Sequence, residues 1–183
     1  SELLAIASKI DDVIPLGRGD PDFHTPKHIV EAAKKALDDN KHHYTPPNGL
    51  PELRVAISKN LREKYNLIYN ENEIVVTAGV QESIALTMLS LLETGDEVLI
   101  TSPRFTTYDL NVRMCNAKPI PIPTYEKNNF SLMPNIIEEK INNKTKLIVL
   151  VSPNNPTGAV TPPENIKKIA EIAIKHDLIV IAD

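Results

Sequence analysis

The 183-residue sequence is poor in cysteine, in aromatic residues and in long apolar runs. Its single cysteine, Cys115, cannot form an intrachain disulfide, and no cysteine cluster is present that would form a structural zinc site. The longest apolar runs, 147–151 and 178–182, are far shorter than the roughly 20 residues that a membrane-spanning helix requires. We therefore expect a protein of a reducing compartment, without membrane contact. The cytoplasm is the default location, or an organelle if a transit segment precedes Ser1.

The charges are nearly balanced, which argues against nucleic acid as a partner. Lysine and arginine total 20, aspartate and glutamate total 24, and the formal net charge is −4. No basic stripe is visible that would neutralise a phosphate backbone. The 42% apolar and 24% charged fractions are typical of a globular chain and exclude a disordered or collagen-like one. The length favours one domain.

From residue 73 onward, short β-branched runs alternate with segments of helical period, which is the pattern of parallel βαβ units. The predicted strands are 74–77, 97–101, 118–122, 146–151 and 178–182. The predicted helices are 81–93, 108–115, 134–142 and 162–176, and a capping box formed by Thr161 and Glu164 opens the last one. The predicted fold class is α/β, with a mostly parallel sheet and helices on both faces.

The first 70 residues have a different, mostly helical character. A helix is expected over 25–41, with Thr25 as its cap and Pro26 at its first position. A second helix is expected over 50–65, where apolar residues recur on one face. The sequence ends at Asp183, directly after a strand of buried type, and domains usually end in exposed segments. We therefore expect this chain to be part of a longer one.

Residues able to bind a ligand follow several of the predicted strands, and the carboxyl ends of parallel strands meet at one edge. After 74–77, Gly79 leaves the amides of Val80 and Gln81 free at a helix N-terminus, where an anion such as phosphate is favoured. The alternative is that Gly79 only permits a tight turn.

Three further strand ends carry an aromatic ring, paired amides and a carboxylate. Phe105 could lie over a planar ring, or it could be a core aromatic. The segment SPNNPTG at 152–158 sets two asparagines among prolines and a glycine. Asp183 would be a buried carboxylate that requires a cationic partner, unless it caps a following helix.

Together these groups match the needs of a phosphorylated aromatic cation. Pyridoxal phosphate is such a molecule, and its chemistry depends on a protonated ring nitrogen. An anionic Asp183 beside that nitrogen would keep it protonated. The residues alone leave a nucleotide-binding α/β protein as the alternative, although the usual glycine-rich nucleotide motifs are absent. No metal site is expected.

The sequence resembles the class I, fold type I, pyridoxal-phosphate-dependent aminotransferases of the aspartate and aromatic type. The resemblance covers essentially the whole chain and rests on the segments 16–26, 43–54, 77–82, 102–108 and 152–160 and on the strand that ends at Asp183. It implies an enzyme of amino acid metabolism that moves an amino group between an amino acid and a 2-oxo acid. The implied cofactor is pyridoxal 5'-phosphate.

The resemblance also implies roles for individual residues at the predicted sheet edge. Val80 and Gln81, after Gly79, would hold the cofactor phosphate, and Phe105 would stack on the pyridine ring. Asn155 would donate a hydrogen bond to the phenolic oxygen of the cofactor. Asp183 would pair with the ring nitrogen and is the expected catalytic residue.

Two residues of the N-terminal part have implied roles as well. Gly19 would lie against the substrate carboxylate, and Tyr44 would reach the phosphate of a neighbouring subunit, so a homodimer is implied. Arg54 lies in a conspicuous motif but is interpreted as structural. Residues 1–70 would form an N-terminal arm and part of a small domain. Residues 71–183 would form the first part of the cofactor-binding large domain.

The family's Schiff-base lysine lies beyond the position of Asp183, so residues 1–183 alone are not expected to transaminate. The sequence leaves three related functions open. A β-lyase or an aminocyclopropane-type synthase of the same fold would share these motifs. A transcription regulator with an aminotransferase-like domain would use the same fold to sense a ligand.

Overall fold

The computed structural model describes residues 6, 9–10, 12–14, 19 and 21–183. The chain divides into two compact units, residues 1–47 and residues 48–183. Within the motif 16–26, residues 16–18 and 20 lie outside the described residues. The predicted domain boundary near residue 70 concerns the whole protein and stays a prediction.

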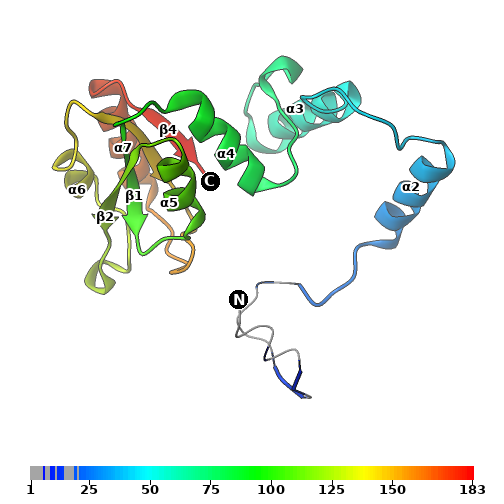
Figure 1. Ribbon diagram of the computed structural model, residues 1–183, viewed down its shortest axis with the longest axis horizontal. Helices are drawn as coiled ribbons and strands as arrows, with labels where there is room; N and C mark the ends of the chain where they lie inside the picture. The colour runs from blue at the N-terminus through cyan, green and yellow to red at the C-terminus, as the bar shows by residue number, and fades with distance from the viewer. Residues whose placement is uncertain (1–5, 7–8, 11, 15–18, 20) are drawn as a thin grey trace. The chain divides into compact units, whose positions relative to one another are not determined.

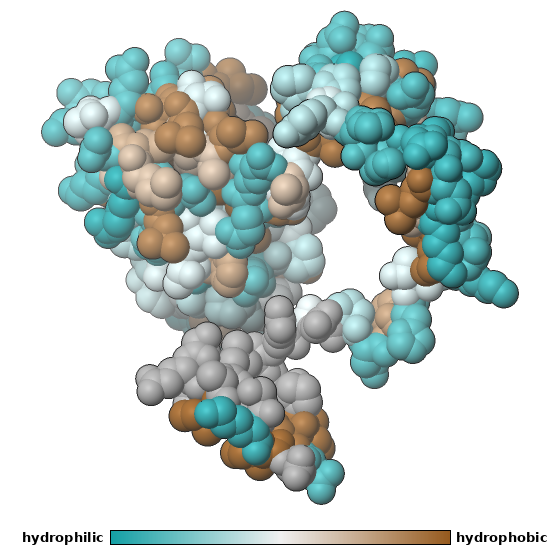
Figure 2. Space-filling model, turned by 45° about the vertical axis from the view of Figure 1, so that its right-hand side comes forward, coloured by the Kyte–Doolittle hydropathy of each residue, from teal (hydrophilic) through white to brown (hydrophobic). Residues whose placement is uncertain are grey.

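The unit formed by residues 1–47 contains helix α2, Lys27–Asp38 (Figure 1). The helix starts one residue later than predicted, because Pro26 has an extended ψ of 136° and is the N-cap. Thr25 therefore lies outside the helix and is not its cap. No residue of α2 is buried within the described chain, and one side of the helix is apolar (Figure 2). The exposed apolar residues of this helix include Ile29, Val30 and Leu37.

The unit formed by residues 48–183 starts with helix α3, Pro51–Tyr65, as the sequence predicts. The buried Arg54 donates from Nη1 to the carbonyl oxygen of Glu71 at 2.7 Å. Ser58 Oγ donates to the carbonyl oxygen of Tyr69 at 2.5 Å. The bond from Arg54 joins α3 to the short helix η1, Glu71–Glu73, and gives Arg54 a structural role, whereas the bond from Ser58 joins α3 to the segment before η1.

Four parallel strands form the sheet, in the order β2-β1-β3-β4. The strands are β1 Glu97–Ser102, β2 Lys118–Pro123, β3 Thr145–Leu150 and β4 Ile179–Ala182. The helices around them are α4 Val80–Leu91, α5 Thr107–Met114, α6 Pro134–Glu138 and α7 Pro163–Lys175, and the short helix η2 spans Glu126–Asn128. The predicted α/β class with a parallel sheet is confirmed.

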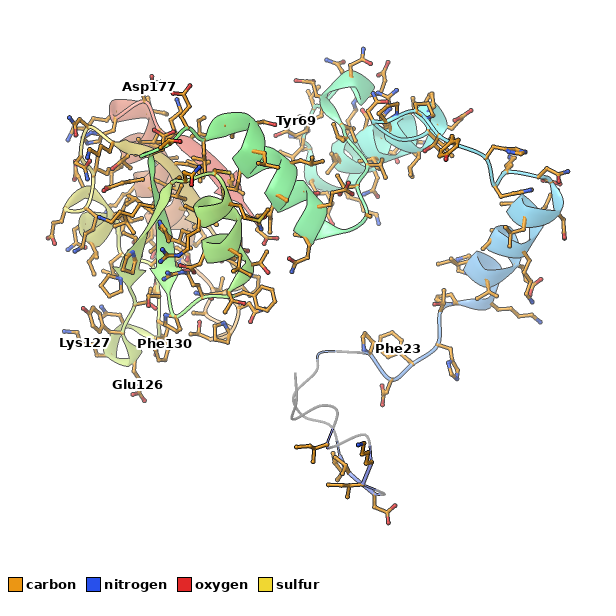
Figure 3. All side chains as sticks on the ribbon, viewed as in Figure 1. Phe23, Tyr69, Glu126, Lys127, Phe130 and Asp177 are labelled. Atoms are coloured by element: carbon orange, nitrogen blue, oxygen red, sulfur yellow. The ribbon has the colours of Figure 1, made fainter. Side chains whose placement is uncertain are left out.

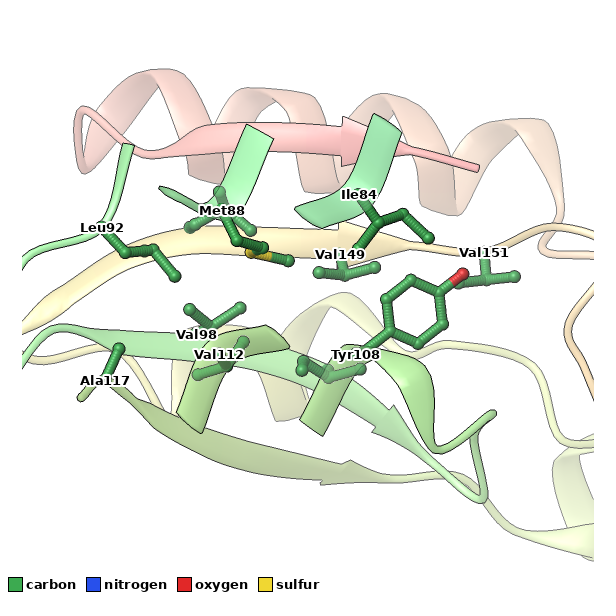
Figure 4. Close-up of a cluster of buried hydrophobic side chains, with 11 residues drawn as sticks. Ile84, Met88, Leu92, Val98, Tyr108, Val112, Ala117, Val149 and Val151 are labelled. Atoms are coloured by element: carbon green, nitrogen blue, oxygen red, sulfur yellow. The ribbon is translucent and has the colours of Figure 1, made fainter. Parts of the chain in front are cut away.

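Helices cover both faces of the sheet, because side chains alternate between the two faces along each strand. Val98 and Ile100 of β1 join one apolar cluster with residues of α4 and α5 (Figure 4). Leu99 of the same strand joins a second cluster with residues of α6 and α7. The sheet therefore forms the middle of three layers, with a separate core on each side.

The predicted strand 74–77 is absent from this sheet. Ile74 has an extended backbone, with φ −117° and ψ 127°, but the segment pairs with no strand in the described part of the chain. The amide of Val76 instead donates to the carbonyl oxygen of Asn48 at 3.1 Å. A β-branched run favours extended backbone, whereas a strand also requires a neighbouring ladder.

The predicted capping box at α7 is also wrong. The helix begins at Pro163, and its N-cap, Pro162, makes no side-chain cap bond. Thr161 is buried one residue before the cap, and its amide donates to Ser152 Oγ at 3.0 Å. Thr161 therefore connects the start of α7 to the segment after β3.

Replacing Gly49 by alanine should destabilise the unit formed by residues 48–183 more than replacing Gly95. Both glycines have φ +93°, which is costly for any side chain. A Cβ at Gly49 would lie 2.6 Å from Val76 Cβ, whereas a Cβ at Gly95 would meet nothing within 4 Å. We expect Gly49→Ala to lower the free energy of unfolding, measured in urea, by about 1–3 kcal/mol more than Gly95→Ala does. Equal losses would mean that the close approach to Val76 has no energetic effect.

Candidate functional site

The two edges of the sheet differ in the groups that they present. Glu126, Lys127 and Phe130 follow β2 at the carboxyl edge, and Asp177 precedes β4 at the amino edge (Figure 3). At the carboxyl edge, the amide of Asp183 donates to the carbonyl oxygen of Leu150 at 2.9 Å. Backbone pairing thus continues past the end of β4 and places Asp183 beside the segment that follows β3.

A buried tyrosine hydroxyl contacts the carboxylate of Asp183. Tyr108, in the first turn of α5, is 3% exposed, and its hydroxyl donates to Asp183 Oδ2. Burial, this hydrogen bond and the charge of Asp183 raise the pKa of Tyr108, so the phenol keeps its proton. Asp183 itself is exposed in this chain, and its expected burial stays a prediction for the whole protein. Sequence reasoning missed Tyr108, although it lies only three residues after Phe105.

The N-terminus of α4 offers free backbone amides. Gly79 is the N-cap, with φ +89°, and no side chain caps this helix end. Val80 and Gln81 are exposed, and amides in the first turn of a helix have no acceptor within the helix. A Cβ at Gly79 would meet nothing within 4 Å, so there is open space beside the turn. These features suit an anion.

Side chains of the same turn hold it in shape. Thr77 Oγ1 lies 2.7 Å from Ser83 Oγ and donates to the carbonyl oxygen of Gly79 at 3.1 Å. The carboxylate of Glu82 accepts a hydrogen bond from the amide of Ala78. Glu82 places a negative charge near the helix start, where the helix dipole is favourable to it.

Helix α4 is directed so that this free end lies toward the carboxyl edge. Ile84, near the start of α4, packs in the same cluster as Tyr108 and Val151, whereas Leu92 lies toward the other edge, near Ala117 (Figure 4). The N-terminal amides of α4 and the side chain of Asp183 therefore both lie toward the carboxyl edge of the sheet.

Phe105 and the two asparagines of SPNNPTG have distinct environments. Phe105 is 42% exposed in this chain, which favours the expected contact with a planar ring over a core position. Asn155 is exposed, but Asn154 is buried, and its Nδ2 lies 3.4 Å from Thr101 Oγ1 and from the carbonyl oxygen of Pro103. Asn154 thus links the segments after β1 and β3 and leaves the neighbouring Asn155 available to a ligand.

Gly19 and Tyr44 belong to the unit formed by residues 1–47. Gly19 is exposed, and a Cβ there would meet nothing within 4 Å. Tyr44 has a fully exposed side chain. The roles predicted for these two residues stay predictions.

The residues at the carboxyl edge fit a bound pyridoxal phosphate. The free amides of α4 and the open space at Gly79 suit its phosphate, and Phe105 presents an exposed ring. Asp183 provides a carboxylate with a neutral hydrogen-bond donor, Tyr108, rather than a competing cation. Among the described residues, no group of three or more histidine, cysteine, aspartate or glutamate side chains could hold a metal ion.

Comparison with known families decides the family of the chain. The family model described as aminotransferase class I and II matches residues 11–183. The chain belongs to the family of class I and II aminotransferases. Within the described residues of the chain, no helix is long and apolar enough to cross a membrane.

Curated relatives support this assignment along the whole chain. The aspartate aminotransferase of Pyrococcus horikoshii is 46% identical over 182 residues, which cover 100% of this aminotransferase chain and 46% of that protein. The aromatic-amino-acid aminotransferase 2 of Thermococcus litoralis is 39% identical over 184 residues, covering 100% of the chain and 47% of that protein. The chain thus spans about half the length of these relatives.

Solved structures share the fold. The aspartate aminotransferase from Thermus thermophilus with maleate has a TM-score of 0.95 and 35% identity, covering 100% of this chain and 48% of that one. The aromatic aminotransferase from Pyrococcus horikoshii has a TM-score of 0.91 and 40% identity, with the same two coverages. The four-stranded parallel sheet therefore matches part of an aminotransferase large domain.

Proposed function

We propose that the whole protein containing this chain is a pyridoxal-phosphate-dependent aminotransferase that moves an amino group between an amino acid and a 2-oxo acid. The observation that carries this proposal is the carboxylate of Asp183, which accepts a hydrogen bond from the buried Tyr108 at the carboxyl edge. Family membership supports the same reaction class. Aspartate and aromatic amino acids are the first substrates to test, because the relatives carry those names.

The residues of the edge would divide the binding of the cofactor among them. The amides of Val80 and Gln81, after the open turn at Gly79, would hold its phosphate. Phe105 would lie on its ring, and Asn155 would donate to its phenolic oxygen.

Asp183 would supply the decisive charge. When bound, pyridoxal phosphate acts as an electron sink for a substrate carbanion. The Asp183 carboxylate would hold a proton on the ring nitrogen, since a negative charge beside a base favours its protonated form. The Tyr108 hydroxyl would orient that carboxylate without neutralising it, because the raised pKa of Tyr108 keeps the phenol neutral.

The N-terminal residues would complete the site in a cytoplasmic homodimer. In this proposal Tyr44 reaches the phosphate in the neighbouring subunit, and Gly19 lies against the substrate carboxylate. The full exposure of Tyr44 in this chain is compatible with such a contact. Residues 1–70 would belong to an N-terminal arm and small domain, and residues 71–183 to the large domain.

A reductive trapping experiment tests the proposal. The full-length protein is incubated with pyridoxal phosphate, reduced with borohydride and digested, and its peptides are searched for a lysine adduct. We expect one adduct, on a lysine outside residues 1–183, together with exchange of amino groups between aspartate or an aromatic amino acid and 2-oxoglutarate. Residues 1–183 alone serve as the control and should show no exchange. Absence of any adduct in the full-length protein would refute the proposal, and release of a thiol from a cysteine conjugate would indicate a β-lyase instead.

A further inference from the structure

A bidentate ion pair closes the segment between β1 and α5. Arg104 Nε lies 2.5 Å from Asp109 Oδ2, and Arg104 Nη2 lies 2.6 Å from Asp109 Oδ1. Arg104 Nη1 also donates to the carbonyl oxygen of Thr101 at 3.2 Å. One guanidinium group thus joins the end of β1 to the first turn of α5.

This pair differs from the other ion pairs of the described residues in its shielding from water. The Arg104 and Asp109 side chains are 17% and 24% exposed, whereas every other pair has at least one partner that is 40% exposed or more. Exposed pairs contribute little, but a shielded bidentate pair restricts the geometry of both partners. The hydrogen bonds from Arg104 hold the pKa of Asp109 below its ordinary value, so the carboxylate is charged at neutral pH.

Two residues that the proposed function uses lie between Arg104 and Asp109 in the sequence. Phe105 follows Arg104 directly, and Tyr108 precedes Asp109 directly. The N-cap of α5, Thr106, makes no side-chain cap bond, so the start of this helix lacks the usual support. The ion pair provides an alternative support at the same place.

We propose that Arg104 and Asp109 are positioning residues that hold Phe105 and Tyr108 in the geometry required by a ring bound at the carboxyl edge. Neither residue would contact the cofactor. Arg104 has its guanidinium directed to Asp109 and to Thr101, so its charge is already used within the protein. The inference rests on the proposed function, since the bound ring is the cofactor of that proposal.

A double-mutant cycle measures the coupling. Arg104→Met, Asp109→Asn and the double variant are made in the full-length protein, and the dissociation constant of pyridoxal phosphate is measured by absorbance titration. We expect each single variant to weaken binding by about threefold to thirtyfold, and the double variant to be no worse than either, because both lose the same contact. Arg62→Met is the matched control, since Arg62 is exposed on α3 and belongs to none of the ion pairs of the described residues.

A second readout reports on Phe105 without the cofactor. Residues 1–183 contain no tryptophan, so Phe105→Trp adds a fluorescent side chain at this position. Its emission is obtained by subtracting the emission of the protein that keeps Phe105. We expect acrylamide to quench this reporter more strongly, and its anisotropy to fall, when Arg104→Met is added. Arg104→Lys keeps the charge but cannot form the bidentate contact, and it should restore binding only in part.

The outcomes separate this inference from the proposed function. If the wild-type protein does not bind pyridoxal phosphate, the proposed function fails, and the inference fails with it, whatever the reporter shows. If the wild-type protein binds, but the variants change only the melting temperature, the pair is merely structural and the inference is overturned. Additive effects of the two single substitutions on binding would also overturn it. Should Arg104→Met not fold, Arg104→Lys provides the same comparison.

Discussion

Asp183→Asn in the full-length protein should lower kcat/KM for amino-group transfer by about 30- to 5,000-fold, which corresponds to about 2–5 kcal/mol. The substitution keeps the size of the side chain and an oxygen able to accept from Tyr108, but it removes the negative charge. A neutral amide cannot hold the proton on the ring nitrogen, so the cofactor would lose its strength as an electron sink. The rate is measured by coupled assay, and the absorbance spectrum of the bound cofactor reports the ring's protonation.

Asp177→Asn is the matched control for this prediction. Asp177 precedes β4 and Asp183 follows it, so the same chemical change is made at opposite ends of one strand. Asparagine tolerates the left-handed backbone at Asp177, where φ is 52°. Asp177→Asn should therefore leave both kcat/KM and the spectrum unchanged. An Asp183→Asn protein with the wild-type rate and spectrum would remove Asp183 from the proposed catalytic role.

Val80→Pro should weaken the binding of pyridoxal phosphate by about 10- to 150-fold, because one hydrogen bond to a charged group is lost. Proline removes the amide proton of Val80, yet it is favoured at the first position of a helix. The preceding Gly79 has ψ 170°, which lies outside the α region that proline disfavours in the residue before it. Helix α4 should therefore form normally while its anion site loses a donor.

Two comparisons make this prediction specific. Val80→Ala shortens the side chain but keeps the amide proton, and it should bind pyridoxal phosphate as the wild type does. Pyridoxal without its phosphate should bind Val80→Pro and wild type equally, because the lost donor serves only the phosphate. Equal weakening for both ligands would place the phosphate elsewhere.

The prediction of the fold succeeded where short-range patterns are sufficient. Val98, Leu99 and Ile100 form a continuous apolar run, which is typical of a strand covered on both faces, and each face of β1 has its own core. The segment 74–77 is also rich in β-branched residues but forms no strand in the described sheet, and its amide at Val76 pairs with Asn48 instead. Composition indicates extended backbone, whereas pairing depends on which partner is near.

The candidate site shows the same division. The order of strands and helices in the sequence was enough to gather the segment after β3 and Asp183 at one edge, because parallel strands end on the same side of a sheet. Which asparagine of SPNNPTG is buried was not predictable, because it depends on Thr101 and Pro103, more than 50 residues away.

The sequence by itself determined the α/β class, the aminotransferase motifs and the position of Asp183 beside the segment after β3, since these follow from local periodicity and from chain order. Only the tertiary structure decided which side chains meet. The bond between Tyr108 and Asp183 joins residues 75 positions apart and exists because α5 and the apolar side chains of β4 pack in the same core cluster on one face of the sheet. Such contacts depend on the packing of whole elements, which no local pattern specifies.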